Sequence, residues 1–296
     1  MTARPELSAI LESARVVSVP LRTQFRGITV REALLFEGEN GWAEWSPFIE
    51  YDDDEAAVWL RAALDQAFGP KREIGEVNLN ATLPAVNGSA IESVLEQFGA
   101  FDTVKIKVAE SGQSIEQDLD RINHVRRLYP EAKLRLDANG GFSVEEALRL
   151  TAQAGELDYF EQPCRSIAEL AELRVKLSGA VRVAADESVR KVEDPMAVVY
   201  AAAADVLVLK AQPLGGVTRA LELARECGLP VTVSSALETE VGMRAGMAFA
   251  TELGGNTAHG LGTLNLFEPV DVFSSEALAS DARREWWFRR LERCFI

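Results

Sequence analysis

Residues 133–188 contain KLRLDAN (133–139), LDYFEQP (157–163) and VRVAADES (181–188), three apolar segments that each run into an acidic residue. Short apolar runs bounded by polar residues are typical of buried parallel strands. The acidic residues lie about 25 residues apart, which is the length of one strand and one helix in a (β/α) barrel. This stretch therefore predicts three consecutive strands of such a barrel.

The acidic residues of these segments are Asp137, Glu161 and Asp186. The C-terminal ends of all strands of a barrel meet at one mouth, so the three carboxylates are expected to converge there. Carboxylate oxygens are the ligands that hard divalent cations prefer, most simply Mg²⁺, with Mn²⁺ as an alternative. A single acidic residue is more often a helix cap or a solvated group. Three at the same place in consecutive repeats favour a metal site.

The alternation of strand and helix extends beyond this stretch. We expect eight strands with helices between them, at VNLNATL, TVKIKV, KLRLDA, LDYFEQ, VRVAAD, DVLVLK, PVTVSS and TAHGL. Eight strands close a parallel barrel. An open doubly wound sheet is the alternative, but no Gly-rich fingerprint follows the first strand. We therefore predict an α/β fold, a TIM-like (β/α)8-type barrel in a modified (β/α)7β form, over residues 77–275.

Residues 1–76 show a different pattern. RVVSVPL, TVREALLFEGE and WAEWSPF are strand-like runs separated by turn residues, and DDDEAAVWLRAALDQAF is an amphipathic helix with an acidic first turn. We predict an N-terminal α+β capping domain here, and we expect residues 276–296 to pack back on it.

Composition argues against several classes of protein. The net charge of −15 disfavours a nucleic-acid partner, because phosphate binding requires clustered lysine and arginine. No apolar run reaches the length of a membrane span, and the N-terminus lacks the apolar core of a signal peptide. The three cysteines are widely spaced and indicate neither a disulfide framework nor a zinc site. We expect a cytoplasmic protein with a small-molecule partner, and nothing in the sequence predicts an oligomeric state.

Two lysines lie on one strand ahead of the acidic residues. Lys105 and Lys107 in VKIKV share one face, while Val104, Ile106 and Val108 share the other. An exposed edge strand would explain the lysines without a function, but the flanking apolar residues favour a central strand whose lysines face the barrel interior. Burial and mutual repulsion are then expected to lower the lysine pKa values, so that one lysine can act as a neutral base. Lys107 is nearer the mouth and is the better candidate.

Lys210 ends DVLVLK, four predicted strands after Lys107, and is therefore expected on the opposite wall. A metal between two lysines suits removal of a proton next to a carboxylate, because the cation stabilises the ene-diolate that forms. Asn139 and Glu187 follow two of the predicted ligands. We expect them to support the metal ligands from behind, and Glu187 to pair with a lysine.

The order VKIKV, RLDANGGF, FEQP, ADES and LVLKAQPLGG closely resembles the muconate-lactonizing-like branch of the enolase superfamily, over about residues 104–216. The segment FRGITVREALLFEGENGWAEWSPFIEYDDDEA is similar to the actinobacterial o-succinylbenzoate synthase family within that branch. The resemblance implies a hydro-lyase of menaquinone biosynthesis. Its reaction is the Mg²⁺-dependent syn dehydration of 2-succinyl-6-hydroxy-2,4-cyclohexadiene-1-carboxylate (SHCHC) to 2-succinylbenzoate.

The resemblance also implies roles for the matching residues. Lys107 would remove the α-proton and then return a proton to the departing hydroxyl. Lys210 would stabilise the enediolate from the opposite face, and Lys105 would tune Lys107. The Mg²⁺ ligands would be Asp137, Glu161 and Asp186.

Substrate contacts are expected from two places. The loops at residues 25–27 and 48–51 would close over the mouth as a lid, with Arg26 meeting a carboxylate. The loops after the last two strands would line the rest, through Ser234, Ser235, Glu238, Gly260 and Gly262. A surface arginine and a tight glycine turn are the ordinary alternatives for Arg26 and for the two glycines.

Other activities of the same branch fit the same residues. Racemisation of N-acylamino acids or epimerisation of dipeptides needs a base on each face of the substrate, and Lys107 with Lys210 would supply both; a cycloisomerase is a further alternative. A Schiff-base aldolase or a non-catalytic metal-binding barrel explains fewer of these residues. His259 is expected to be a core residue, and Cys164 has no histidine base near it in sequence, so neither is a catalytic candidate.

Overall fold

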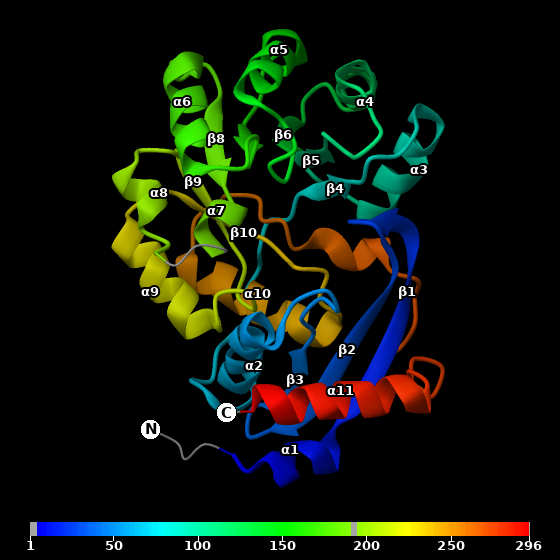
Figure 1. Cartoon of the computed structure of the whole chain (residues 1–296). Coiled ribbons are helices and arrows are strands. Elements are labelled where there is room, and N and C mark those ends of the chain that lie inside the picture. The colour runs from blue at the N-terminus through cyan, green and yellow to red at the C-terminus, as the bar shows by residue number, and fades with distance from the viewer. Residues whose placement is uncertain (1–4, 191–193, 296) are drawn as a thin grey trace.

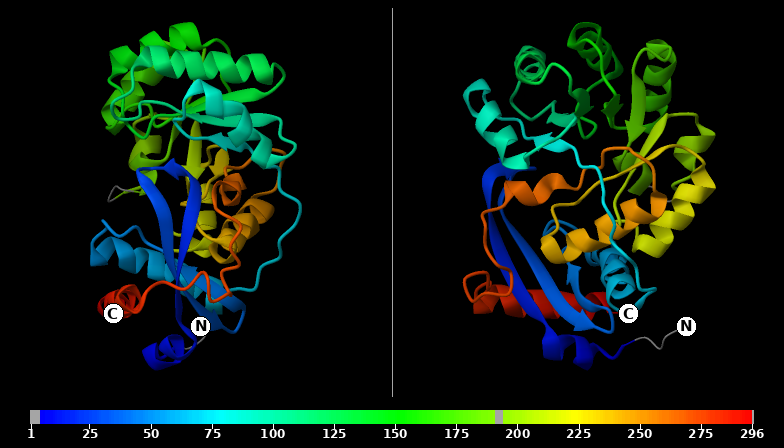
Figure 2. Two further views of the ribbon diagram at one scale, coloured as in Figure 1. Left: turned by 90° about the vertical axis from the view of Figure 1, so that its right-hand side faces the viewer. Right: turned by 180° about the vertical axis from the view of Figure 1, so that it is seen from behind.

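The computed structural model describes residues 5–190 and 194–295. A small antiparallel sheet from the N-terminal part of the chain lies beside a larger ring of parallel strands and helices (Figure 1). The view from behind shows the C-terminal helix returning to the N-terminal sheet (Figure 2). No helix in these residue ranges is long and apolar enough to cross a membrane.

The N-terminal unit contains α1 (Leu7–Ser13), β1 (Arg15–Phe25), β2 (Ile28–Gly38), β3 (Gly41–Trp45) and α2 (Asp53–Phe68). The strands pair antiparallel in the order β1-β2-β3. The β1–β2 turn needs positive φ at Arg26 and Gly27, and Asp52 caps α2 by accepting the Glu55 N–H at 2.8 Å. Helix α11 (Asp281–Cys294) packs on α2 and β1, where Trp287 meets Trp45 edge to face.

The second sheet is parallel and has seven strands, in the order β10-β9-β8-β7-β6-β5-β4. Its members are β4 (Ala81–Leu83), β5 (Thr103–Lys107), β6 (Lys133–Asp137), β7 (Tyr159–Glu161), β8 (Arg182–Ala185), β9 (Val206–Leu209) and β10 (Val231–Val233). The helices between or after them are α3 (Ile91–Leu95), α4 (Ile115–Leu128), α5 (Val144–Ala154), α6 (Ile167–Leu177), α7 (Glu187–Arg190), α8 (Ala197–Tyr200), α9 (Val217–Cys227) and α10 (Glu240–Leu253).

The eighth position of the ring is filled by residues 258–260. His259 bridges to Leu79 and Gly260 bridges to Ser234, both in the parallel sense. The eighth predicted strand is thus a connection with one bridged residue on each side, not a regular strand. These bridges join the two edges of the seven-stranded sheet, which confirms the predicted barrel architecture with its N-terminal cap.

Strand parity places apolar and charged residues on opposite faces of the barrel wall. Val104, Ile106 and Val108 belong to the large core between strands and helices. The interior holds a smaller apolar cluster of Tyr159, Ala184, Val206 and Val208. Side chains of the same parity that lie nearer the C-terminal strand ends are charged, and they form the floor of the mouth.

A buried polar contact holds the cap on the barrel. Glu44 in β3 accepts hydrogen bonds from the backbone of Thr239 at 3.0 Å and of Gly242 at 2.9 Å, at the first turn of α10. Free N–H groups and the helix dipole favour a carboxylate at that position. Apolar packing of Leu35 with Leu237 and Val241 surrounds it. The cap is therefore seated next to the loop that follows β10.

Candidate active site

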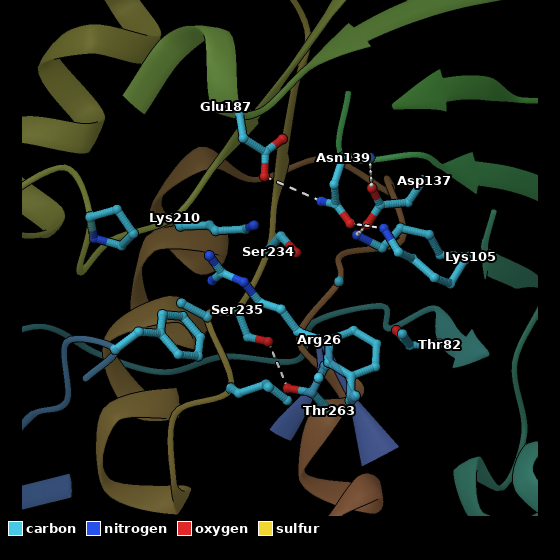
Figure 3. A pocket seen from close by; sticks show the side chains of 18 of the residues that line it. Arg26, Thr82, Lys105, Asp137, Asn139, Glu187, Lys210, Ser234, Ser235 and Thr263 are labelled. Carbon is cyan, nitrogen blue, oxygen red and sulfur yellow. Dashed lines mark hydrogen bonds and ion pairs between the residues drawn. The ribbon is translucent and has the colours of Figure 1, made fainter. Parts of the chain in front are cut away.

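A cavity of about 490 Å³ opens at the C-terminal ends of the barrel strands and is roofed by the cap. The barrel contributes Lys105, Lys107, Asp137 and Lys210 to its lining, and the cap contributes Arg26. Figure 3 shows Lys105 and Lys210 reaching into it from opposite sides. A concave site with converging charges at this end of a barrel is the usual place for catalysis.

The three predicted carboxylates lie on adjacent strands. Asp137 ends β6 and pairs in register with Glu161, which ends β7, while Asp186 directly follows β8. Glu161 and Asp186 are fully buried, and Asp137 is only 6% exposed. Because parallel strands end at the same edge of the sheet, the sequence spacing alone brings these groups together.

Lys105 lies between two of these carboxylates. Its Nζ is 3.1 Å from Asp137 Oδ2 and 3.1 Å from Glu161 Oε1. Burial opposes its charge, but Asp137 and Glu161 raise the pKa of Lys105 well above its ordinary value. The prediction that burial and repulsion lower the lysine pKa values is therefore wrong for Lys105, because the two neighbouring carboxylates outweigh the effect of burial.

The other two lysines lie on opposite walls, with β6, β7 and β8 between their strands. Lys107 donates to Asn139 Oδ1, and Lys210 donates to Asp186 Oδ2 at 2.6 Å. The cavity separates them, and both line it. A planar substrate in this cavity would have one lysine on each side.

Arg190 is a site residue that the sequence did not reveal. Its Nε donates to Asp186 Oδ1 at 2.9 Å, and its Nη2 donates to Glu187 Oε1 at 2.8 Å. Glu187 Oε1 also accepts from Asn139 Nδ2 at 3.2 Å. The predicted lysine partner of Glu187 is thus replaced by an arginine and an amide. The only sequence signal was the four-residue spacing from Asp186, which brings the two together within one helical turn.

The carboxylates differ in how easily they lose a proton. Burial raises the pKa of Glu161 to about 8, and the negative charges of Asp137 and Asp186 add to this effect. Burial acts in the same direction on Asp186, but Lys210 and Arg190 outweigh it and hold the pKa of Asp186 well below its usual range. Burial and the neighbouring Asp186 raise the pKa of Glu187. Glu161 is thus the carboxylate whose charged form is opposed most strongly by its buried surroundings.

The donor set suits a divalent cation. Across residues 5–190 and 194–295, no three histidine, cysteine or acidic side chains are arranged as a ready metal cluster. Lys105 bridges Asp137 and Glu161, while Lys210 holds Asp186. The ammonium group of Lys105 lies 3.1 Å from an oxygen atom of each of two buried carboxylates. The oxygen atoms therefore surround a position that suits a cation. Oxygen-only ligands match Mg²⁺ or Mn²⁺.

The predicted substrate contacts are brought to the cavity with two exceptions. Arg26 donates to the Tyr51 hydroxyl at 2.8 Å and stacks 4.0 Å from the Phe48 ring centre. Ser234, Ser235 and Gly260 line the cavity, and so does Thr263, which the sequence did not suggest and which lies 2.6 Å from Ser235 Oγ. Two predicted residues lie elsewhere, namely Glu238 and Gly262.

The exceptions have a structural cause. Gly262 starts a 3₁₀ turn and faces the Asn80 carbonyl and Phe98, so that its backbone borders a different cavity. Glu238 is buried and accepts the Ala236 N–H at 2.6 Å, and burial raises its pKa to about 7. Both residues support the loops that carry the site.

Two residues set aside from the sequence are structural. His259 is buried, and its Nδ1 accepts the Val233 N–H at 2.9 Å. Cys164 is buried, and burial raises the pKa of its thiol to about 12, which leaves no nucleophilic thiolate.

Comparison with known families places the chain. The model of enolase C-terminal domain-like sequences matches residues 88–277, and that of enolase N-terminal domain-like sequences matches residues 16–67. Among solved structures, the L-Ala-D/L-Glu epimerase from Bacillus subtilis superposes with a TM-score of 0.71 at 23% identity, covering 88% of this chain and 91% of that one. The muconate lactonizing enzyme from Pseudomonas putida gives a TM-score of 0.68 at 18% identity, over 88% and 89%. These likenesses show a shared fold.

Curated relatives are closer in sequence. The o-succinylbenzoate synthase of Mycobacterium bovis is 44% identical over 317 aligned residues, covering 98% of this chain and 96% of that protein. The o-succinylbenzoate synthase of Mycobacterium ulcerans is 44% identical over 316 aligned residues, covering 98% and 95%. The chain therefore belongs to the enolase superfamily and, within it, to the o-succinylbenzoate synthase family.

Proposed function

We propose that this chain is an o-succinylbenzoate synthase, a hydro-lyase that removes water from SHCHC to give 2-succinylbenzoate in menaquinone biosynthesis. The observation that carries the proposal is the 44% identity to o-succinylbenzoate synthases over 98% of the chain. The geometry supports it, because two lysines face one cavity from opposite walls next to buried carboxylates.

We assign the cation site to Asp137, Glu161 and Asp186, with Mg²⁺ as the first choice and Mn²⁺ as the second. Members of the superfamily depend on a divalent metal. When bound, the cation would neutralise the negative charge that develops on the substrate carboxylate. Lys105 would then move off the carboxylates that it bridges.

Lys107 is the proposed base. Its Nζ accepts the α-proton of SHCHC, and the electrons of the broken C–H bond move first onto the adjacent carboxylate. They then form the new ring double bond as the C–O bond breaks. The same lysine then gives its proton to the departing hydroxyl, so that water leaves on the face from which the proton came. The ammonium group of Lys210 on the other wall stabilises the negative charge that builds up in between.

The cap completes the substrate site. Arg26, held over Phe48 and by the Tyr51 hydroxyl, presents a guanidinium group suited to a carboxylate of the substrate. Ser234, Ser235 and the backbone at Gly260 also line the cavity and offer hydrogen bonds. The proposed site of action is the cytoplasm, in keeping with three free, buried cysteines.

Turnover of the purified protein with SHCHC and Mg²⁺ tests this function. Ultraviolet absorbance follows the conversion of the diene to an aromatic ring, and an EDTA control removes the metal. We expect EDTA-sensitive turnover. Absence of turnover with Mg²⁺ bound would reject the dehydratase.

Racemisation of N-succinylamino acids is the second candidate, favoured by the placement of one lysine on each wall. Deuterium exchange at the α-carbon in D₂O, followed by NMR, measures this activity directly. Exchange without dehydration would make racemisation the primary function.

A further inference from the structure

Arg190 connects the two walls of the site. Its guanidinium group donates from Nε to Asp186 Oδ1 at 2.9 Å and from Nη2 to Glu187 Oε1 at 2.8 Å. Its side chain is only 5% exposed, although the residue lines the cavity. A planar guanidinium group that holds two carboxylates at once fixes both in direction as well as in charge.

Each of these carboxylates is linked by hydrogen bonds to one lysine, Asp186 directly and Glu187 through Asn139. Asp186 uses its other oxygen, Oδ2, to accept from Lys210 Nζ at 2.6 Å. Glu187 Oε1 accepts from Asn139 Nδ2 at 3.2 Å, and Asn139 Oδ1 in turn accepts from Lys107 Nζ. Figure 3 shows the Glu187–Asn139 link, with Lys210 on the Glu187 side of it. Arg190 is thus the branch point between Lys107 and Lys210.

We propose that Arg190 is a positioning residue that sets Lys107 and Lys210 at fixed places on the two sides of the substrate. The proposal rests on the proposed function, because it concerns how these lysines meet the reacting carbon. A lysine side chain has four flexible bonds and loses considerable entropy when it is held still. Without Arg190, Asp186 and Glu187 would repel each other, and both lysines would lose their anchors.

A role in charge balance alone makes a different prediction. If Arg190 only offset the negative charge of Asp186 and Glu187, a lysine in its place would serve nearly as well. A single ammonium group cannot reproduce the planar fork that bonds both carboxylates in fixed directions. The pair Arg190→Lys and Arg190→Gln therefore separates geometry from charge.

The test combines steady-state kinetics with calorimetric titration of Mg²⁺. We expect Arg190→Gln and Arg190→Lys each to lower kcat about 100-fold, with KM changed less than about threefold, as for a reacting group moved by about 1 Å. We expect Mg²⁺ affinity to stay equal or to increase in Arg190→Gln, because a positive charge next to Asp186 is lost. Arg174→Gln, which removes a similar Arg–Asp pair on the outer surface of α6, is the matched control and keeps wild-type kcat.

A double-mutant cycle with Glu187→Gln tests the route to Lys107. Coupled residues give effects on kcat that do not add, so the double variant should lose little more than Arg190→Gln alone. Additive effects would overturn the route through Glu187. Wild-type kcat in Arg190→Lys, or a tenfold loss of Mg²⁺ affinity in Arg190→Gln, would overturn the positioning role in favour of charge balance or of a scaffold for the metal.

The outcome stays distinct from that of the proposed function. If the wild-type protein does not dehydrate SHCHC, the proposed function fails, and the same variants are measured by deuterium exchange into N-succinylamino acids. A fall of about 100-fold in exchange with unchanged Mg²⁺ affinity would still support Arg190 as a positioning residue. Wild-type exchange in Arg190→Gln would overturn it.

Discussion

The two ends of the barrel both contain buried ion pairs but differ in how those pairs are held. At the N-terminal end, Arg135 donates to Asp158 at 2.7 Å, to the Asn80 side chain at 3.2 Å and to the Ala258 carbonyl at 2.6 Å. Its guanidinium group also stacks on the Tyr159 ring at 4.6 Å. Arg135 is therefore held from several directions by side-chain and backbone atoms of the barrel itself.

At the mouth the partners are lysines and carboxylates that face a cavity. Lys105 bridges Asp137 and Glu161, a contact that a cation bound there would have to replace, and Lys210 is held by Asp186 beside the cavity. The charged groups at the N-terminal end are thus enclosed by the fold, whereas those at the mouth line the cavity of the proposed active site. In barrel enzymes generally, the active site lies at the C-terminal ends of the strands.

The largest expected effect is at the mouth. Lys107→Ala and Lys210→Ala should each lower dehydration at least about 1000-fold, because each removes a group that acts on the reacting atoms in the proposed mechanism. Both variants should stay folded. Lys210→Ala should also lower the free energy of unfolding, because Lys210 pairs with the fully buried Asp186, which keeps only Arg190 in this variant. Lys133→Ala, at the exposed N-terminal end of β6, is the control with normal turnover. Turnover within tenfold of wild type in either mouth variant would refute the two-lysine mechanism.

The opposite result is expected at the N-terminal end. Asp158→Asn leaves Arg135 buried without a charged partner, so the free energy of unfolding should fall by about 3–5 kcal/mol. Urea denaturation measures this loss, and kcat of the folded protein should stay within about twofold. Glu172→Gln, which breaks an exposed pair with Lys176, should change stability by less than about 1 kcal/mol. A large loss of kcat in folded Asp158→Asn would contradict the purely structural role of the ion pair at the N-terminal end.

A pH titration sharpens the comparison through His259. Burial, helped by Arg135, lowers the pKa of His259 to about 4, and its neutral Nδ1 accepts the Val233 N–H. Between about pH 6.5 and pH 4, His259 binds a proton in the unfolded chain but not in the folded one. The free energy of unfolding therefore falls by up to about 3 kcal/mol as the pH is lowered through this range. His259→Gln keeps an acceptor for the N–H and should lack this loss.

The measurement is urea denaturation of both proteins at several pH values between 4 and 7. His124→Gln, which removes the other histidine of the chain, is the control and should follow the wild-type slope. Parallel stability curves for wild type and His259→Gln would show that the buried imidazole does not produce the acid sensitivity.

The comparison also explains how far the sequence predicted the site. Strand ends and side-chain parity are local properties, so Asp137, Glu161 and Asp186 were found from spacing, and Lys105 from alternation with valine and isoleucine. Arg190 was missed because its partners depend on the path of a short helix after β8. Gly262 was misplaced because a 3₁₀ turn directs it toward Asn80 and Phe98. Paths of loops and directions of long side chains depend on distant contacts, which no local pattern contains.

The smallest expected effect comes from the outer partner of the N-terminal network. Arg182 also pairs with Asp158, but its side chain is 47% exposed. Arg182→Ala should therefore lower the free energy of unfolding by at most about 1 kcal/mol, because water solvates the exposed group and Asp158 retains Arg135. Urea denaturation of this variant beside Asp158→Asn separates the inner pair from the outer one. Equal losses in both variants would mean that the three residues act as one unit, and that burial of Arg135 is not what makes this end of the barrel structural.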